Sequence, residues 1–268
     1  MDKLNNDKIR SAVRENYGKV AASGSAGCGC SPSSCCGTSR EVTAADISLG
    51  LGYSGEDVNA VPEGANMGLG CGNPQAIASL KPGETVLDLG SGGGFDCFLA
   101  AGAVGETGRV IGVDMTPEMV SKARANVAKT EFRNVEFRLG EIEHLPVADS
   151  SVDVIISNCV INLSPEKQKV FDDAFRVLSR GGRLAVSDVV ATAVFPEAVK
   201  KDLAMYTGCI TGASFIPELE AMLKRAGFEN IRIRPKDESR AFIRDWAPGS
   251  KIEDYVVSAT IEAIKARG

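Results

Sequence analysis

The feature that most constrains the fold of this chain is a glycine-rich loop between an apolar segment and a predicted helix. The apolar segment Thr85–Leu89 is typical of a short buried strand, Gly90–Gly94 contains four glycines, and Asp96–Val104 has the pattern of a helix. Glycines at a strand-to-helix turn let the backbone approach a ligand closely, because no side chains are there to collide with it. The segment therefore predicts the first unit of a nucleotide-binding α/β domain.

Predicted strands and helices continue to alternate after this loop. The expected strands are Arg109–Val113, Val135–Leu139, Val152–Ser157 and Arg183–Asp188, and the expected helices are Pro117–Lys129 and Glu166–Leu178. Further along we expect the helix Glu218–Ala226, an edge strand Asn230–Arg234 and a final helix Asp254–Lys265. The alternation predicts an α/β fold with a doubly wound, mainly parallel sheet and helices on both faces.

The part of the chain before the first strand has a different character. Residues 4–20 have the apolar spacing of an amphipathic helix, whereas residues 21–39 are mostly small and include Cys28, Cys30, Cys35 and Cys36. Small side chains cannot pack a core, so we expect a mobile loop that carries thiols. Residues 41–75 are interrupted by glycines and are expected to form turns rather than long regular elements.

Composition narrows the class of protein. The 268 residues are 44% hydrophobic and 24% charged, which is enough for one substantial core and a smaller appendage. A formal net charge of −5 gives no electrostatic reason to bind nucleic acid or an anionic membrane surface. No segment has the apolar run of a signal peptide or a membrane span. We expect a cytoplasmic protein that acts on small molecules, with its eight cysteines reduced.

Two carboxylates accompany the glycine loop. Asp88 comes directly before it, and Asp114 follows the second strand, where an acidic side chain accepts hydrogen bonds from ribose hydroxyls. A dinucleotide dehydrogenase shares this logic, but its third loop glycine would stand at the position of Phe95. A simpler alternative for Asp114 is a turn or helix-capping carboxylate ahead of Pro117.

Together with Gly140–Glu143 after the third strand, these motifs resemble those of class I S-adenosylmethionine (SAM) methyltransferases. The resemblance implies a Rossmann-like core with Asp88 and the glycines near the methionine part of SAM, Asp114 on the ribose, and Glu141 and Ile142 beside the adenine. On this basis the cofactor-binding residues are predicted to be Asp88, Gly90, Ser91, Gly92, Gly94, Asp114, Met115, Glu141, Ile142 and Asn158.

Three cysteines far apart in the sequence are predicted to meet near that cofactor. Cys159 lies where the fourth strand ends, and open α/β sheets bind ligands beyond the carboxyl ends of their strands. Cys209 lies in the segment after the fifth strand, and Cys71 in the glycine-rich approach to the first. The alternative is that all three, like Cys97 on the predicted helix Asp96–Val104, are ordinary buried packing residues.

The surroundings of these cysteines look like those of arsenite SAM methyltransferases. The segments that carry the likeness are Ser157–Leu163, Gly68–Gly72 and Thr207–Cys209, within a similarity from Glu41 to Trp246. The resemblance implies arsenite as substrate and Cys71, Cys159 and Cys209 as arsenic-binding or catalytic residues.

In that family a further N-terminal cysteine takes part in a disulfide relay that thioredoxin or a small thiol resets. Here Cys28, Cys30, Cys35 and Cys36 are all candidates, and we favour Cys35 or Cys36. The alternative for these four is a zinc site, although their spacing departs from the usual Cys-x₂₋₄-Cys pairs.

Elementary chemistry supports the assignment. Arsenic(III) is soft and thiophilic, so three thiolates suit it as soft sulfur ligands suit soft metals. The lone pair that remains on arsenic can attack a methyl group without a general base. His144 is accordingly expected to lie on the surface or in the cofactor loop. Asp188, which ends the fifth strand, is expected either to line the pocket or to cap a turn.

We expect three parts: residues 1–75 with the helix, the cysteine-rich loop and a substrate-side segment, 76–192 as the SAM-binding core, and 193–268 as a capping insertion with a C-terminal α/β extension. Two rival functions remain. One is a class I methyltransferase acting on carbon or oxygen of a small organic molecule, and the other is a protein that sequesters arsenic or metals without turnover.

Overall fold

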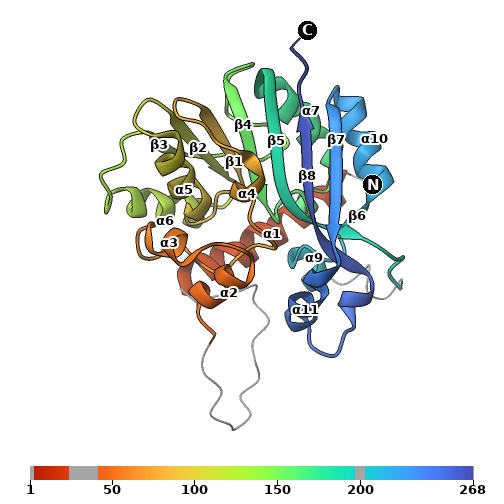
Figure 1. Ribbon diagram of the computed structural model, residues 1–268. Coiled ribbons are helices and arrows are strands. Elements are labelled where there is room, and N and C mark those ends of the chain that lie inside the picture. The colour runs from red at the N-terminus through yellow and green to blue at the C-terminus, as the bar shows by residue number, and fades with distance from the viewer. Residues whose placement is uncertain (1–2, 24–41, 197–202, 268) are drawn as a thin grey trace.

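A single eight-stranded sheet organises the protein in the computed structural model, which describes residues 3–23, 42–196 and 203–267 (Figure 1). The strand order is β3-β2-β1-β4-β5-β8-β7, with β6 pairing to β5 beside this path. The strands are β1 Thr85–Leu89, β2 Arg109–Asp114, β3 Val135–Leu139, β4 Val152–Asn158, β5 Leu178–Ala191, β6 Ser214–Phe215, β7 Glu229–Lys236 and β8 Val256–Ile264.

Helices cover both faces of the sheet, which confirms the predicted fold class. The α-helices are α1 Lys3–Ser23, α2 Ala44–Gly50, α3 Gly55–Asn59, α4 Gln75–Ala78, α5 Phe95–Val104, α6 Pro117–Val127, α7 Lys167–Val177, α9 Leu203–Thr207, α10 Ile216–Ala226 and α11 Arg240–Ile243. Short 3₁₀ turns lie at Ile161–Leu163, Asp237–Ser239, Arg244–Trp246 and Ile252–Asp254.

Successive side chains of the parallel strands point to opposite faces of the sheet, and helices bury both faces. Val86 and Val110, which are register partners on β1 and β2, pack with α5 and α6 on one face. Their neighbours Leu87 and Ile111 pack with α7 and α10 on the other. A sheet covered by helices on both faces leaves the ends of its strands as the place for a ligand.

The predicted final helix Asp254–Lys265 is wrong, because this segment forms strand β8. Strand β8 runs antiparallel between β5 and β7 and is buried over most of its length. Its valines, isoleucines and threonine favour an extended backbone, and burial on both faces removes the alternation that would have revealed a strand. The C-terminal extension therefore completes the central sheet.

The other predicted elements agree with the structure to within a few residues at most boundaries. The predicted strand Arg183–Asp188 is the middle of the longer β5, and β7 is the expected edge strand. Residues 41–75 contain two short helices, α2 and α3, each begun by a capping box, at Thr43 and Ser54 respectively. The predicted thiol loop lies outside the described residues except for positions 21–23, which belong to α1.

Helix α1 runs below the sheet in Figure 1, close to α6 and α9, and lies across the carboxyl ends of the parallel strands. Its apolar side includes the buried residues Val13 and Val20. It thereby closes an edge that the strands leave open. Within the described ranges, no helix is long and apolar enough to cross a lipid bilayer.

The strand assignment of β8 predicts how two neighbouring residues respond to truncation. Ile261 is 1% exposed and packs in the core, whereas the adjacent Glu262 faces the opposite side and is only half-buried. Ile261→Ala is expected to lower the free energy of unfolding by about 2–5 kcal/mol, because it leaves a cavity. Glu262→Ala is expected to change it by about 0.5 kcal/mol or less. Urea denaturation followed by circular dichroism measures both, and equal losses would contradict the strand.

Candidate functional site

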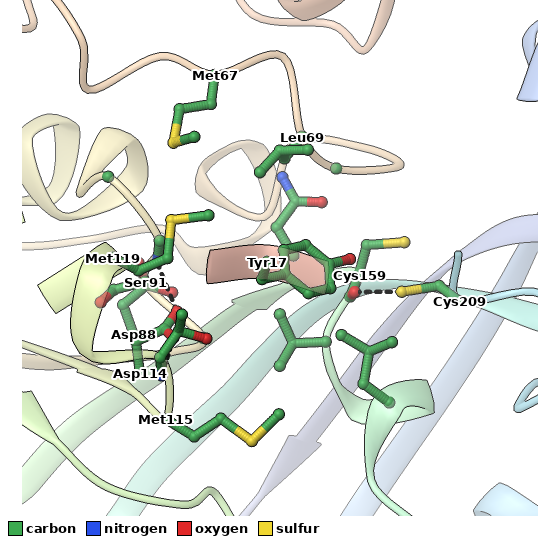
Figure 2. A pocket seen from close by; sticks show the side chains of 18 of the residues that line it. Tyr17, Met67, Leu69, Asp88, Ser91, Asp114, Met115, Met119, Cys159 and Cys209 are labelled. Atoms are coloured by element: carbon green, nitrogen blue, oxygen red, sulfur yellow. Dashed lines mark hydrogen bonds between the residues drawn. The ribbon is translucent and has the colours of Figure 1, made fainter. Parts of the chain in front are cut away.

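One pocket lies beyond the carboxyl ends of β1, β2 and β4, between the sheet, α1 and the segment before β1 (Figure 2). Figure 2 shows Asp88, Ser91 and Asp114 on one side of it, Cys159 and Cys209 on the other, and Tyr17 between them. The residues named from the sequence that line it are Asp88, Gly90, Ser91, Gly92, Asp114, Met115, Ile142, Asn158, Cys159 and Cys209. Gly94, Glu141 and Cys71 are not part of this lining.

The glycine loop is shaped by close approach at Gly90. Its φ is +71°, and a Cβ atom there would lie 2.4 Å from a methyl group of Val160. Gly92 has a φ of +51° and faces open space, so the backbone at this position is accessible to a ligand. Gly94 begins α5, and a Cβ atom there would meet Phe137 at 2.7 Å. The structure therefore gives Gly94 a packing role rather than a place in the lining.

Asp114 anchors this loop. Its two carboxylate oxygens accept hydrogen bonds from the backbone N–H groups of Gly92 and Thr116, each at 2.9 Å. Burial raises the pKa of its carboxyl group, although the two backbone donors oppose that shift. The Thr116 side chain also hydrogen-bonds to it, so of about four acceptor positions on a carboxylate one remains for a ligand hydroxyl. The turn role and the ribose role expected of Asp114 are compatible.

Ser91 gives a further sign that a polar ligand fits the pocket. Its hydroxyl oxygen is buried and has no hydrogen-bond partner among the described residues. A buried polar group without a partner costs free energy, so such groups in native proteins mark unfilled ligand or water positions. With the exposed backbone at Gly92 and the carboxylate of Asp114, the residues present fit a nucleoside-type cofactor.

The sequence did not identify a buried network beside this pocket. Asp96, which also lines the pocket, accepts a hydrogen bond from the Tyr53 hydroxyl at 2.8 Å. The Asn158 amide donates to Tyr53 Oη at 3.0 Å and to the backbone oxygen of Gly72 at 2.8 Å. Its carbonyl oxygen accepts from the backbone N–H of Cys71 at 3.0 Å. Asn158 thus lies between the cofactor side and Cys71.

Helix α1 contributes residues that sequence reasoning left without a role. Val13 and Tyr17 line the pocket, and so does Arg10, which donates to Glu143 at 3.0 Å and Glu166 at 2.7 Å. Glu141, expected beside adenine, instead accepts a hydrogen bond from Arg14 at 3.3 Å. His144 is exposed, as expected. The apolar side of α1 was the sequence signal that could have predicted its packing over the pocket.

The three cysteines come together in one buried cluster of side chains. Cys71, Cys159 and Cys209 are at most 9% exposed, and the Cys209 thiol donates to the Cys159 backbone oxygen at 2.8 Å. Cys159 and Cys209 have φ values of +61° and +63°, a left-handed conformation that costs about 1–3 kcal/mol for residues other than glycine. By contrast, Cys97 is fully buried within α5 and donates to Asp88 at 3.2 Å.

Two of these thiols, those of Cys71 and Cys159, have a raised pKa and are held in their protonated form. Burial raises the pKa of Cys71. Hydrogen bonding with the Cys209 and Cys71 thiols, together with burial, raises the pKa of Cys159 well above its usual value. Such thiols ionise when a thiophilic centre replaces their protons.

Asp188 joins this cluster. One of its oxygens lies within 4.8 Å of the sulfur atoms of Cys71 and Cys159, which also lie within 4.8 Å of each other. Burial raises the pKa of Asp188 to about 6, against hydrogen bonds from the backbone N–H groups of Val189 and Ile161. Of the two expectations for this residue, the structure shows the turn-capping one, because Asp188 is not part of the pocket lining and lies behind it beside the thiols.

A doubly wound sheet with this loop, a carboxylate at the end of β2 and a pocket beyond the carboxyl ends of the strands defines a class I methyltransferase, and the cofactor is SAM. The family described as "Methyltransferase domain" matches residues 80–234. An arsenite methyltransferase of Halobacterium salinarum is 58% identical over 97% of this chain, and one of Aquipseudomonas alcaligenes is 40% identical over 77%. The chain belongs to the arsenite methyltransferase family.

This chain is also similar to a solved structure, and it spans only part of the length of its relatives. The crystal structure of an arsenic(III) S-adenosylmethionine methyltransferase from Chlamydomonas reinhardtii matches with a TM-score of 0.62 and 32% identity. That match covers 85% of this chain and 76% of the algal one. This chain spans 67% of the length of the Halobacterium relative and 61% of the Aquipseudomonas relative.

Asp96 predicts a distinctive dependence of stability on pH. Burial raises its pKa from 3.8 to about 6, so between these values the folded protein binds more protons than the unfolded chain. The free energy of unfolding therefore falls as pH rises through this range. Asp96→Asn cannot ionise, and relative to the wild type it should gain about 1–3 kcal/mol between pH 4 and pH 7.5. Urea denaturation at both pH values measures this gain.

A control of opposite sign comes from Asp173, whose pKa is lowered despite partial burial because Arg176 donates to it. The stability that this carboxylate contributes is present above its unfolded pKa and is lost in acid. Asp173→Asn should therefore lose stability relative to the wild type as pH rises. The assignment of Asp96 fails if both variants shift in the same direction.

Proposed function

We propose that the chain methylates arsenite, with Cys71, Cys159 and Cys209 as the thiols that hold arsenic(III). The observation that carries this proposal is a buried cluster of three cysteines at the end of β4, directly beside the cofactor pocket. Soft sulfur donors suit a soft thiophilic centre and have no function for an ordinary carbon or oxygen acceptor. The names of the relatives point to the same substrate.

The chemistry of binding balances without an external base. Arsenite enters as As(OH)₃, and three Cys–S–As bonds form while three As–O bonds break. Each thiol proton leaves with a hydroxyl group as water, so the raised pKa of Cys71 and Cys159 is no obstacle. Arsenic keeps its lone pair, which serves as the nucleophile. This agrees with a site whose lining contains no histidine among the described residues.

The Cys209 thiol must turn for this to happen, because it is directed at the Cys159 backbone oxygen. Cys209 follows β5 in the chain and packs in the same buried cluster as Cys71 and Cys159. Cys159 and Cys209 both have a left-handed backbone and both line the pocket.

The cofactor-binding role is proposed for Asp88, Gly90, Ser91, Gly92, Asp114, Met115, Ile142 and Asn158, all of which line the pocket. SAM, when bound, supplies an electrophilic methyl group on a sulfonium. Asp114 would orient a ribose, and Ile142 would contact an apolar ring face. The buried Ser91 hydroxyl, which has no partner among the described residues, would form a hydrogen bond with the cofactor. Asn158 would act indirectly, by fixing Cys71.

The proposal includes a return of arsenic to the trivalent state. Methyl transfer to the arsenic lone pair leaves arsenic formally pentavalent, and two thiolates that close to a disulfide return two electrons to it. Cys35 or Cys36 is proposed to join this step, although both lie outside the described residues. Thioredoxin or a small thiol would reduce the disulfide, which favours a reducing compartment such as the cytoplasm.

An assay of methylated products tests the central proposal. Purified chain with arsenite, SAM and a thiol reductant is expected to yield methylarsenicals, separated and quantified by speciation. Cys71→Ser, Cys159→Ser and Cys209→Ser should each lower the rate at least about tenfold, because a serine hydroxyl is a poor arsenic ligand. All three should still bind S-adenosylhomocysteine in calorimetry.

Cys97→Ser is the matched control, because Cys97 is a buried free cysteine away from the cluster and a serine hydroxyl retains its bond to Asp88. It should keep the wild-type rate within about threefold. A wild type that binds the cofactor but leaves arsenite unmethylated would transfer the assignment to a small organic acceptor.

The relay is tested separately by counting turnovers. A variant with Cys28, Cys30, Cys35 and Cys36 all changed to serine should complete a first turnover in a rapid-quench experiment and then stop. The reason is that the cluster retains its arsenic ligands but lacks the thiol that resets the site. Steady-state turnover at the wild-type rate would show that the N-terminal cysteines have no part in reduction.

A further inference from the structure

The donor atoms gathered around Cys159 are a mixed sulfur and oxygen set. The sulfur atoms of Cys71 and Cys159 and a carboxylate oxygen of Asp188 all lie within 4.8 Å of one another. The Cys209 thiol is engaged with a backbone oxygen instead. In this conformation the structure offers two thiols and one carboxylate, which differs from the three thiols that arsenic(III) takes.

Asp188 has the surroundings of a metal-ligating carboxylate. One oxygen accepts hydrogen bonds from Val189 N at 2.7 Å and Asn162 Nδ2 at 2.8 Å, and the other accepts from Ile161 N at 2.9 Å. The backbone N–H of Asn162 adds a further hydrogen bond, so several donors hold the carboxylate in place. Carboxylates that bind metals are held in this way by outer hydrogen bonds.

The charges in this region also suit a cation. Two thiolates and a carboxylate carry three negative charges, and a divalent cation reduces this total to one. The positive charge of Lys167 interacts favourably with Asp188 and offsets the remainder. Lys167 is itself held in place, because its Nζ donates to the backbone oxygen of Gly212 at 2.7 Å.

We propose that Cys71, Cys159 and Asp188 form a binding site for a divalent thiophilic cation of the zinc class, which competes with arsenite. Such d¹⁰ cations accept thiolate sulfur and carboxylate oxygen together in tetrahedral sites, and three protein ligands leave a fourth position for water. Binding releases the two thiol protons and transfers no electrons. Because arsenic(III) and the divalent cation would both bind Cys71 and Cys159, only one of them can be bound at a time.

The two sites differ in their third protein ligand, and this difference makes the proposal testable. Asp188 belongs to the divalent site, and Cys209 belongs to the proposed arsenic site. The divalent site itself requires neither Cys209 nor catalysis, whereas its competition with arsenite rests on the proposed function.

The experiment uses Cd²⁺ and Zn²⁺ as probes on the full chain, in a background with Cys28, Cys30, Cys35 and Cys36 changed to serine so that these thiols cannot contribute. Cd²⁺ is followed by its thiolate charge-transfer absorption, Zn²⁺ by competition with Cd²⁺, and arsenite by equilibrium dialysis. Asp188→Asn is expected to weaken Cd²⁺ binding at least about tenfold, and to weaken it more than it weakens arsenite binding. Cys209→Ser is expected to weaken arsenite binding at least about tenfold and to leave Cd²⁺ affinity within about threefold.

Several results would overturn the proposal: unchanged Cd²⁺ affinity in Asp188→Asn, a loss in Cys209→Ser as large as in Cys159→Ser, or no Cd²⁺ binding once the N-terminal cysteines are removed. If Asp188→Asn fails to fold by circular dichroism, cadmium NMR of the background protein decides, because the chemical shift distinguishes two sulfur ligands from three. If no variant binds arsenite, the proposed function fails while the Cd²⁺ measurements still decide the divalent site.

Discussion

The geometry of the site depends on the side-chain amide of Asn158, the last residue of β4. It accepts from the backbone N–H of Cys71 and donates to Gly72 and Tyr53, so it joins a central strand to the segment before β1. Each such bond stabilises the fold by only about 1 kcal/mol, yet leaving one buried partner unmade costs more. Ser258 on β8 completes the arrangement by donating to the Cys71 backbone oxygen at 2.6 Å. Cys71 is therefore held by hydrogen bonds to two strands, β4 and β8.

Backbone strain is concentrated at the other two cysteines. Cys159 and Cys209 both adopt a left-handed conformation, which persists only where the surroundings determine it strongly. For Cys159 that support comes from its own backbone N–H, which donates to Ser187 at 2.8 Å, and from Asp188, which holds the turn that follows. For Cys209 it comes from a bond to the backbone oxygen of Tyr206 at 3.0 Å. The fold thus bears a free-energy cost at the two cysteines that line the pocket.

Sequence reasoning succeeded where one local rule determined the outcome. The glycine loop and the end of β4 follow from strand-to-helix turns and from the common carboxyl edge of parallel strands. It failed for β8, because a strand buried on both faces has no alternation to distinguish it from a helix. It also could not reveal that Arg14 on α1 binds the carboxylate of Glu141, because the two residues are 127 positions apart. Asp96 escaped notice because a carboxylate in the first turn of a helix is ordinarily a dipole partner.

The cofactor side of the pocket contains buried carboxylates whose negative charge a cationic ligand would balance. Asp88, Asp96 and Asp114 are buried, and the loss of water around each carboxylate raises its pKa. Arg10 lines the same pocket, but its guanidinium is already paired with Glu143 and Glu166. A methyl donor whose methionine part carries positive charge would supply the positive charge that these carboxylates lack. Its binding should therefore favour the ionised carboxylates, and by linkage their ionisation should favour its binding.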